Sequence, residues 1–321
     1  MAMKESLPRS VLSGAHTRPA LARSGVSKRE LDGPLWDRTN RGLWFWTGGG
    51  APDASERIRR IRGLLPDGAA IGGWAAAALL GASQFDGEDG AGRPIPVPIC
   101  LGRHQTCRRR EELVVWRSEL LPGETVDIDG TPVTSPERTC FDLLRRSAGV
   151  QAAVVAADAL LRDVSVDRGH VTDLIRQRRR WRGLPTARRA FDLAETRVRS
   201  TGESRLRMLW VLDAGLPRPL VNRRLTNPQG YLLGEVDLFD PEAGVAGEYD
   251  GEVHAGAARR AADHTREEQL ERARVIVVRF TAEDLSRQRL RAVARLRAAR
   301  ATGLRRDRSQ DGWILQPLTE R

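Results

Sequence analysis

The chain has 321 residues, of which 40% are hydrophobic and 30% are charged, which is typical of a folded protein with two or three domains. No apolar run approaches the roughly 20 residues of a membrane span, and the N-terminal stretch MAMKESLPRS has no apolar signal-peptide region. These features exclude a membrane-spanning class, and we expect a cytoplasmic protein with no membrane partner.

The formal net charge of +11 favours a polyanionic partner, because phosphate contacts release condensed counterions. Nucleic acid is the first candidate. Codon bias is a second explanation, since the chain has only two lysines, Lys4 and Lys28, and arginine supplies nearly all of the positive charge, as GC-rich genes tend to give. The chain has three cysteines, Cys100, Cys107 and Cys140. They cannot all form disulfides with one another, and their spacing is not that of a zinc site.

Changes in composition divide the chain into six segments and predict an α+β multidomain protein. We expect a disordered lead-in (1–14), a small unit of helices and a strand (15–50), a middle α+β unit (55–165), a basic helical connector (166–200), a C-terminal unit with a central mixed sheet flanked by helices (201–302) and a flexible tail (303–321).

The first folded segment has the signals of two short helices joined by a tight turn. Pro19 suits the first turn of one helix and Gly25 ends it, while Ser27 and Glu30 have the spacing of a capping box that begins the next. An aromatic and basic strand, 41–46, would be the wing of a winged helix-turn-helix. The residues expected to face DNA are Lys28, Arg29, Arg38 and Arg41. The alternative is a helical pair that contacts no DNA.

The middle unit mixes helices and strands without a catalytic constellation. Two helices flank a Pro-Asp-Gly turn, three stretches then alternate like strands, and Asp129 with Gly130 predicts a tight hairpin turn. Ser135 and Pro136 then begin a helix.

The connector carries a basic run, RQRRRWRG, that precedes an acidic hairpin. Arginine clusters bind phosphate strongly, so we expect a surface that follows the phosphate backbone of a nucleic acid. Its leading residues are Arg178, Arg179 and Arg180. The alternative is a solvated helical face.

The acidic hairpin, GEVDLFDPEAGVAGEYDGEVH, has a carboxylate at nearly every second position of two short strands. A four-residue loop, 241–244, sets an antiparallel register in which paired residue numbers sum to 485. This register puts Asp237 opposite Glu248 and Glu235 opposite Asp250. Since strand side chains alternate, the four carboxylates share one face. The opposite face takes Val236, Leu238, Gly247 and Tyr249.

Carboxylates in this arrangement need compensation, because like charges opposite one another have Cβ atoms only about 5 Å apart. A divalent cation is the simplest candidate, since Mg²⁺ binds one or two carboxylates and completes its shell with waters and phosphate oxygens. The alternative is an edge hairpin whose solvated acids repel weakly.

The elements around the hairpin have the order helix, strand, strand, strand, helix, strand, helix. Together with the segments ESRLR, GLPRP, DHTREEQL and VVRFTAEDL, residues 202–299 resemble a small nuclease-like domain of unknown function that is related to very-short-patch repair endonucleases, in the PD-(D/E)xK superfamily. The resemblance implies a restriction-endonuclease-like fold. Earlier segments, including GWAAAALLGA and VTSPERTCFDL, resemble AbiEi-type antitoxin proteins, whose N-terminal winged helix binds DNA.

The nuclease resemblance implies that Asp237 and Glu248 hold Mg²⁺ or Mn²⁺ and that Glu203 supports them from the preceding helix. Asp250 occupies the position where lysine is usual, and no lysine follows Lys28. Asp250 is therefore expected either to add a third metal ligand, or to leave the acid or base role to another residue.

His254 is the candidate for that role, because the unperturbed pKa of histidine lies near neutrality. A loop histidine without chemistry is the alternative. Arg266 in the following helix is expected to neutralise the substrate phosphate.

These residues predict metal-assisted hydrolysis of DNA phosphodiester bonds, in which Mg²⁺ polarises a phosphoryl oxygen and activates water. The competing class is a regulator without catalysis, an antitoxin-like DNA-binding repressor that keeps the nuclease fold as a scaffold. A cognate toxin is a further partner that the second resemblance raises.

Overall fold

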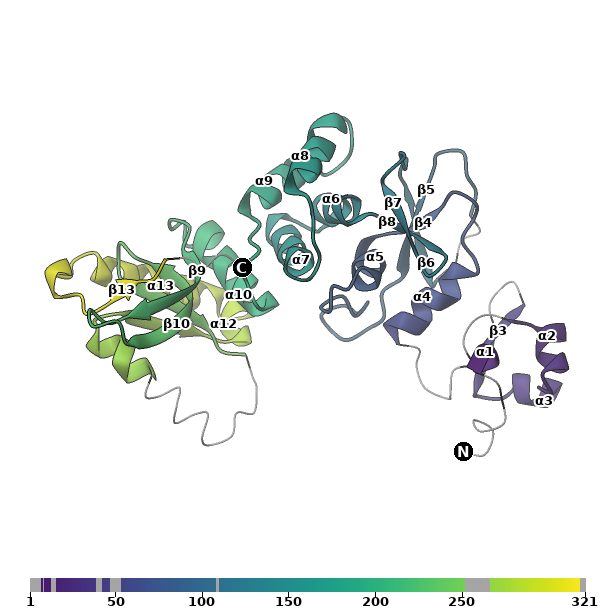
Figure 1. Cartoon of the computed structure of the whole chain (residues 1–321), viewed down its shortest axis with the longest axis horizontal. Helices are drawn as coiled ribbons and strands as arrows, with labels where there is room; N and C mark the ends of the chain where they lie inside the picture. The colour runs from purple at the N-terminus through teal and green to yellow at the C-terminus, as the bar shows by residue number, and fades with distance from the viewer. Residues whose placement is uncertain are drawn as a thin grey trace. The chain divides into compact units, whose positions relative to one another are not determined.

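A computed structural model of the chain describes residues 7, 9–12, 16–38, 42–46, 53–107, 110–251 and 266–317. Helices and mixed sheets alternate along the chain, so the fold class is mixed α and β (Figure 1). The chain forms two compact units. Unit 1 comprises Met1–Leu143 and Asp163–Arg178, and unit 2 comprises Leu144–Arg162 and Arg179–Arg321.

Unit 1 begins with three short helices and a small sheet. The helices are α1 (Arg9–Leu12), α2 (Arg18–Arg23) and α3 (Lys28–Leu31), and the strands are β1 (His16–Thr17), β2 (Trp36–Arg38) and β3 (Leu43–Trp46) in the order β1-β3-β2. The predicted capping box is confirmed: the Ser27 hydroxyl accepts from Glu30 N–H, and the Glu30 carboxylate accepts from Ser27 N–H. Gly25 takes the positive φ of 87° that ends α2.

One segment differs from the expected disordered lead-in. Within 1–14, residues Arg9–Leu12 form α1, and Val11 is buried with Leu21, Leu31 and Trp36. The apolar side chain of Val11 explains the difference, because burying it contributes to the small core.

The rest of unit 1 is built on a five-stranded sheet in the order β6-β5-β4-β8-β7. Its strands are β4 (Ala70–Ile71), β5 (Val97–Leu101), β6 (Leu113–Arg117), β7 (Thr125–Ile128) and β8 (Thr131–Thr134). The predicted hairpin turn is confirmed, with φ of 49° at Asp129 and 70° at Gly130. Helices α4 (Ala54–Arg62) and α5 (Gly73–Leu79) pack their apolar faces on this sheet.

Four helices follow β8: α6 (Pro136–Arg146), α7 (Val150–Asp163), α8 (Arg168–Gln177) and α9 (Leu184–Leu193). In unit 1 the fully buried guanidinium of Arg138, on α6, forms ion pairs with Glu124 and Asp142 and donates to Ser118 Oγ and Glu119 O. This network joins the start of α6 to the loops around the sheet.

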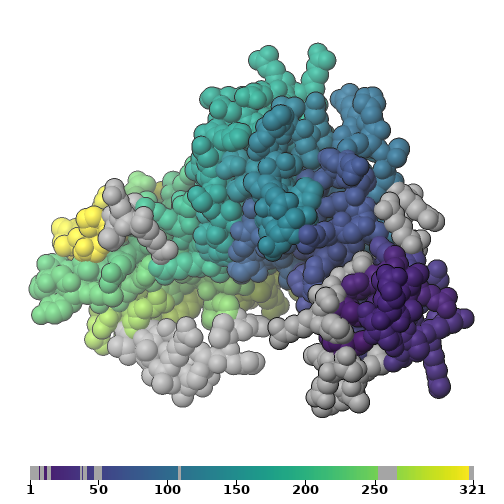
Figure 2. Space-filling view, turned by 45° about the vertical axis from the view of Figure 1, so that its right-hand side comes forward, coloured from purple at the N-terminus to yellow at the C-terminus, as the bar shows by residue number. Residues whose placement is uncertain are grey.

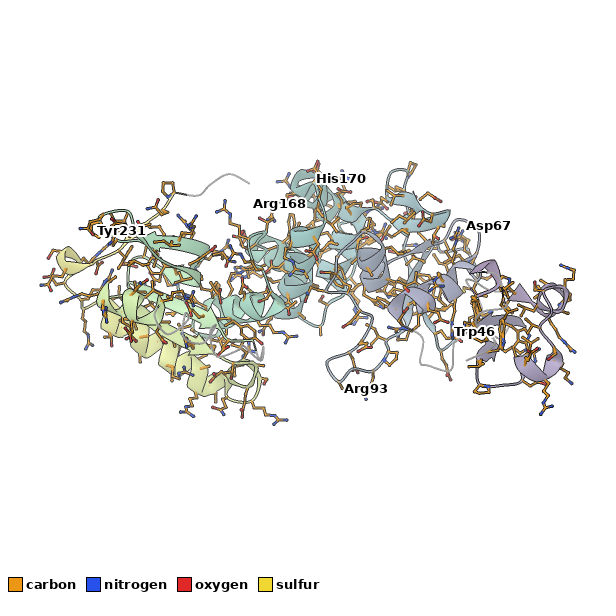
Figure 3. The ribbon with its side chains drawn as sticks, turned by 60° about the horizontal axis from the view of Figure 1, so that its bottom comes forward. Trp46, Asp67, Arg93, Arg168, His170 and Tyr231 are labelled. Atoms are coloured by element: carbon orange, nitrogen blue, oxygen red, sulfur yellow. The ribbon has the colours of Figure 1, made fainter. Side chains whose placement is uncertain are left out.

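Unit 2 contains a second five-stranded sheet, in the order β12-β11-β10-β9-β13. Its strands are β9 (Leu220–Thr226), β10 (Leu232–Asp240), β11 (Val245–Tyr249), β12 (Ile276–Phe280) and β13 (Ile314–Leu315). The pairing of β11 with β12 is parallel and the other pairings are antiparallel. The β9–β10 hairpin projects Tyr231, which is 73% exposed, at its tip (Figure 3).

The helices of unit 2 are α10 (Thr201–Met208), a π-helical continuation η1 (Leu209–Asp213), α12 (Ala282–Ser286), α13 (Arg289–Gly303), a helix at 266–272 and a short 3₁₀ helix η2 (Arg308–Gln310). The predicted order of helix, three strands, helix, strand and helix is therefore present from α10 to α13.

Both faces of the unit 2 sheet are covered. Leu238 and Val245 pack with residues of α10, η1 and α13, whereas their neighbours Phe239 and Ala246 pack with Leu270 of the helix at 266–272. Because successive side chains point to opposite faces, this division shows a sheet buried on both sides. The acidic hairpin is thus central in the sheet and is not the edge hairpin of the solvated alternative.

The segment 303–321 was expected to be flexible, but residues 303–317 are ordered in the structure. Residues Ile314–Leu315 pair with β9 as the edge strand β13, and the Trp313 ring meets Phe239 edge-on with 4.9 Å between centroids. In Figure 2 the yellow C-terminal residues lie against green residues of the same unit. The two aromatic rings supply the apolar burial that orders this segment.

Within the described ranges, every helix is too short or too polar to cross a membrane.

Candidate functional site

The acidic hairpin has the predicted register. Residues 241–244 form the turn, and the observed partners Leu238 with Gly247, Phe239 with Ala246 and Asp240 with Val245 all sum to 485. Continuing the same register places Asp237 opposite Glu248. The backbone N–H of Tyr249 donates to Asp237 Oδ2 at 2.9 Å, which ties the carboxylate to β11.

The neighbouring strands extend this pair into a row of four polar residues. On one side, the β9–β10 register places Asn222 opposite Asp237, between the observed pairs at Val221 and Arg223. On the other side, Glu248 pairs with Arg279 in the parallel ladder of β11 and β12. The row therefore crosses four strands of the sheet.

The two acids open into one cavity of about 210 Å³. It is lined by Asp237, Glu248, Tyr249, Asp250, Arg266 and Arg279. Each lining residue other than Tyr249 carries a formal charge at neutral pH, and the three carboxylates outnumber the two guanidinium groups. This composition suits a charged or metal-bearing ligand rather than an apolar one.

Two arginines offset the charge of Glu248, whose residue is only 7% exposed. Arg266 donates from Nη2 to Glu248 Oε2 at 2.9 Å and from Nη1 to Glu235 O at 2.6 Å. Arg279 Nε lies 3.7 Å from Glu248 Oε2, and its Nη2 is 3.0 Å from Glu267 Oε2. Compensation by a cation, which the sequence suggested, is thus not needed for Glu248 in this arrangement.

Asp237 is less well compensated. Burial raises the pKa of its carboxyl to about 6, and the charges of Glu203 and Glu248 add to this effect. The Tyr249 N–H and the Arg266 guanidinium favour the ionised form but do not outweigh burial and the neighbouring acids. A carboxylate with a raised pKa beside other acids is a common feature of functional sites.

Glu203 reaches this site from the first turn of α10, where its N–H is capped by the Ser200 hydroxyl. Its Oε2 accepts from Arg199 N–H and from Asn222 Nδ2, both at 2.8 Å. Glu203 is 6% exposed, so the predicted support from the preceding helix is a buried carboxylate held by hydrogen bonds.

The helix that carries Glu203 is anchored by Asp158 of α7. Asp158 accepts from Ser204 Oγ at 2.8 Å, from Arg207 Nη2 at 2.6 Å and from Glu195 N–H at 2.7 Å. Its burial raises the pKa of the carboxyl despite these donors. The anchor fixes the N-terminal half of α10 beside β10.

Two predicted acids lie at the margin. Asp250 follows the end of β11, is exposed, and lines the cavity. Glu235, predicted to face Asp250, instead forms an ion pair with Arg199. His254, the predicted acid or base, lies outside the described residues.

The residues present fit a hard divalent cation in chemistry. Two carboxylates on adjacent strands are a sufficient protein contribution for Mg²⁺, which draws its other ligands from water and phosphate. Across the described ranges, however, no three His, Cys, Asp or Glu side chains converge closely enough to enclose a metal ion. A cation at this site would therefore rely on Asp237 and Glu248, and Arg266 would have to release Glu248.

The predicted nucleic-acid contacts fall into three groups. Lys28 and Arg29 are exposed on α3, and Arg38 is exposed on β2 with its guanidinium 5.6 Å from the Trp44 ring centroid. Arg41 lies outside the described residues.

In the basic connector, Arg178 behaves differently from its neighbours. Its side chain is 9% exposed and forms an ion pair with Glu124, so it is engaged within unit 1. Arg179 and Arg180 are exposed.

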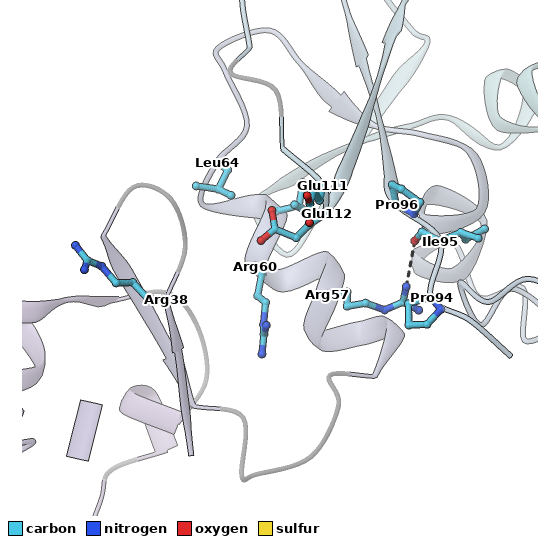
Figure 4. A pocket seen from close by; sticks show the side chains of 10 residues that line it. Arg38, Arg57, Arg60, Leu64, Pro94, Ile95, Pro96, Glu111 and Glu112 are labelled. Atoms are coloured by element: carbon cyan, nitrogen blue, oxygen red, sulfur yellow. Dashed lines mark hydrogen bonds between the residues drawn. The ribbon is translucent and has the colours of Figure 1, made fainter. Parts of the chain in front are cut away.

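A second cavity, of about 320 Å³, lies in unit 1. Figure 4 shows the hydrogen bond from Arg57 Nη1 to Ile95 O among the residues that line this cavity, which also include Arg38, Glu111 and Glu112. Arg60 pairs with Glu56 and lies over the Phe45 ring.

Sequence reasoning missed Asn222 and Arg279 as members of the row. Neither stands in an acidic pattern, and only the strand order places them beside Asp237 and Glu248. The sign that could have pointed to Arg279 is the buried strand VVRF, in which a single charged residue interrupts apolar ones.

Comparison with known proteins gives one distant relative. The chain is 29% identical over 170 residues to Uncharacterized protein Rv2248 of Mycobacterium tuberculosis (strain ATCC 25618 / H37Rv), a match over 53% of this chain and 62% of that protein. The aligned part thus spans less than two thirds of the relative. No protein-family model matches the chain, and no solved structure matches it.

Proposed function

We propose that the chain is a DNA-binding protein whose unit 2 is a metal-dependent endonuclease-like domain that hydrolyses DNA phosphodiester bonds. The observation that carries this proposal is the pair Asp237 and Glu248, which face each other on the central strands of a mixed sheet and open into one charged cavity. The order of elements from α10 to α13 supports a restriction-endonuclease-like topology of the PD-(D/E)xK kind.

Asp237 and Glu248 would hold Mg²⁺ or Mn²⁺, with Asp250 at the rim as an additional oxygen donor. When bound there, the cation supplies electrostatic stabilisation of phosphoryl oxygens and promotes attack by water. Glu203 holds its place through Arg199 N–H and Asn222, and so keeps a buried negative charge beside Asp237.

The two arginines of the cavity, Arg266 and Arg279, would bind the DNA phosphate. Arg266 and Arg279 present guanidinium groups beside Glu248, and these groups match phosphate in charge and in hydrogen-bond geometry. A DNA phosphate that enters the cavity can take over the donors of Arg266, which frees Glu248. The lysine that is usual in this superfamily is absent, so we assign to Arg266 the role of the positively charged residue that contacts the substrate phosphate.

DNA contact outside the cavity would come from the small N-terminal unit, read as a winged helix-turn-helix. Lys28 and Arg29 lie exposed on α3, the second helix of the pair, and Arg38 lies on the adjoining strand. Arg179 and Arg180 are available to phosphates, since both are exposed. Basic residues of this kind give salt-dependent binding.

Plasmid nicking tests the catalytic proposal. Wild-type protein is expected to nick supercoiled DNA with Mg²⁺ or Mn²⁺, while Asp237→Asn and Glu248→Gln lose at least about a hundredfold of the rate, since each removes a charge that binds the cation. Glu242→Gln is the matched control, because Glu242 is an exposed acid of the same hairpin that pairs with Arg300. Equal cutting by all four proteins would overturn the proposal.

A non-catalytic, antitoxin-like regulator is the second candidate. Two observations favour it: Glu248 is already paired with two arginines, and an aspartate stands at the usual lysine position. This function predicts no nicking by any variant, together with a shift of operator DNA in a gel that Lys28→Ala and Arg29→Ala weaken. A cognate toxin would be a partner of such a regulator, and co-purification with the product of the adjacent gene tests it.

A further inference from the structure

Asn222 has an unusual backbone for its position. Among the described residues, three non-glycine residues have positive φ: Asp129 at 49°, Asn222 at 48° and Arg274 at 64°. Asp129 and Arg274 lie in turns, whereas Asn222 lies inside strand β9. Left-handed conformations are strained for residues with a Cβ, and asparagine tolerates them better than most. Strain of this kind persists where surrounding structure imposes it and is frequent at functional sites.

The side chain of Asn222 contacts the acid site, which consists of the carboxylates of Glu203, Asp237 and Glu248. Its Nδ2 donates to Glu203 Oε2 at 2.8 Å and to Arg197 O at 2.7 Å. Both partners are acceptors, so the amide orientation is fixed by chemistry, with the nitrogen toward Glu203. Asn222 is therefore the side-chain donor that links Glu203 on α10 to the strand beside Asp237.

The other end of the amide is also informative. Asn222 Oδ1 is buried and accepts no hydrogen bond within the described part of the chain. A buried acceptor without a donor is costly and calls for an explanation, such as a ligand or ordered water. The register places this residue opposite Asp237, in the row that continues to Glu248 and Arg279.

We infer that Asn222 is a positioning residue of the acid site, which holds Glu203 beside Asp237 and so sets the affinity of the site for a divalent cation. The inference rests on the proposed function. Two observations support it: the left-handed backbone in a strand, and the hydrogen bonds from Nδ2 to Glu203 and Arg197.

Thermal unfolding with and without MnCl₂ tests this role. Asn222→Gly is expected to weaken Mn²⁺ binding about 10-fold to 100-fold, as loss of a residue that orients metal ligands typically does. Without metal, its melting temperature is expected to fall, because loss of the two hydrogen bonds from Asn222 outweighs the relief of the positive φ by glycine. The Mn²⁺ response of each protein is therefore measured as a shift from its own metal-free melting temperature. A purely structural role predicts the same fall in metal-free stability but an unchanged Mn²⁺ affinity.

Arg274→Gly is the matched control, since Arg274 is the other non-glycine residue with a positive φ in the described part of unit 2 and lies far along the chain from Asn222. It should keep the wild-type response to Mn²⁺. A second comparison uses Glu203→Gln: if Asn222 acts through Glu203, adding Asn222→Gly to Glu203→Gln causes little further loss of Mn²⁺ affinity.

The outcomes separate the inference from the proposed function. A wild-type protein that shows no stabilisation by Mn²⁺ overturns the proposed cation site and this inference with it. A wild type that responds, together with Asn222→Gly that responds at the same concentrations, overturns the inference and leaves the proposed function standing. Additive losses in the double variant also overturn it.

Discussion

Both units bury acids together with arginines, but they balance the charges differently. In unit 1, the carboxylates of Glu124 and Asp142 are matched by Arg138 and Arg178, and the Arg138 guanidinium donates to four protein acceptors. Burial alone would lower the pKa of Arg138, yet the neighbouring carboxylates raise it above its ordinary value.

In unit 2, the three neighbouring carboxylates of Glu203, Asp237 and Glu248 outnumber the arginines that pair with them in the described part of the chain, Arg266 and Arg279. Glu203 accepts from Arg199 N–H and from Asn222 Nδ2, and Asp237 accepts from Tyr249 N–H. Of these three acids, only Glu248 forms an ion pair with a described arginine. Burial raises the pKa of Asp237, and Asp237 and Glu248 open into a cavity. A buried network in which every carboxylate is paired with arginine stabilises the fold. A buried cluster with more carboxylates than arginines is instead suited to bind a positively charged ligand.

The largest expected effect comes from breaking the complete network. Arg138→Met leaves Glu124 and Asp142 buried with less compensation and should lower the free energy of unfolding of unit 1 by about 3–5 kcal/mol. Calorimetry that resolves the transitions of the two units measures it. A loss below about 1 kcal/mol would contradict the view that this network stabilises unit 1.

Asp237→Asn should raise the free energy of unfolding above neutral pH, whereas Arg138→Met lowers it. The folded-state pKa of Asp237 is about 6, above the unfolded value near 3.8, so the folded chain binds more protons between these values. The free energy of unfolding therefore falls as pH rises from about 4 to about 6 and stays lower at higher pH. Removing the ionisable group should raise stability by about 1–2 kcal/mol at pH 8, with little change at pH 4.

Urea denaturation at both pH values measures this effect. Asp142→Asn is the matched variant from unit 1 and should destabilise at pH 8, because it takes a charged partner from Arg138. If both variants change stability in the same direction at pH 8, the contrast between the two networks is wrong.

Arg266→Gln should have a smaller effect. The Arg266 side chain is 32% exposed, so loss of its ion pair with Glu248 should cost about 1 kcal/mol. The same change frees a carboxylate oxygen, so stabilisation by Mn²⁺ should increase relative to wild type. Thermal unfolding across a MnCl₂ titration measures both, and a weaker metal response would show that Arg266 does not compete with the cation.

The smallest effect is expected at the surface of unit 1. Arg93 and Asp89 form an exposed ion pair, with the Arg93 side chain 79% exposed (Figure 3). Arg93→Ala should change the free energy of unfolding by less than about 1 kcal/mol, because solvent screens the pair. The same calorimetry as for Arg138→Met provides the baseline against which the buried network is judged.

Local signals in the sequence predicted local structure well. The capping box at Ser27, the turn at Asp129 and the register of the acidic hairpin all depend on residues a few positions apart, and each is present. These features follow from capping chemistry, left-handed turn residues and loop length, which the sequence states directly.

Features that depend on distant partners were not predictable. Strand β4 has two residues, Ala70–Ile71, and exists because β5 and β8 pair on either side of it. Arg178 looked like a solvent-facing member of a basic run, but Glu124, 54 positions away, binds it. The site shows the same division, since the acid pair followed from the hairpin while Asn222 and Arg279 required the order of the sheet.

Strand β13 has a consequence for how the protein is made. Gln316 donates to Thr226 Oγ1 across 90 positions of sequence, beside the strand that carries Asn222. During synthesis from the N-terminus, β9 must leave the ribosome long before this partner does, so its outer backbone groups stay open to water or chaperones in the interval. The sheet in unit 2 is therefore completed well after β9 has been synthesised, and a stalled nascent chain that lacks β13 would present an unprotected strand edge.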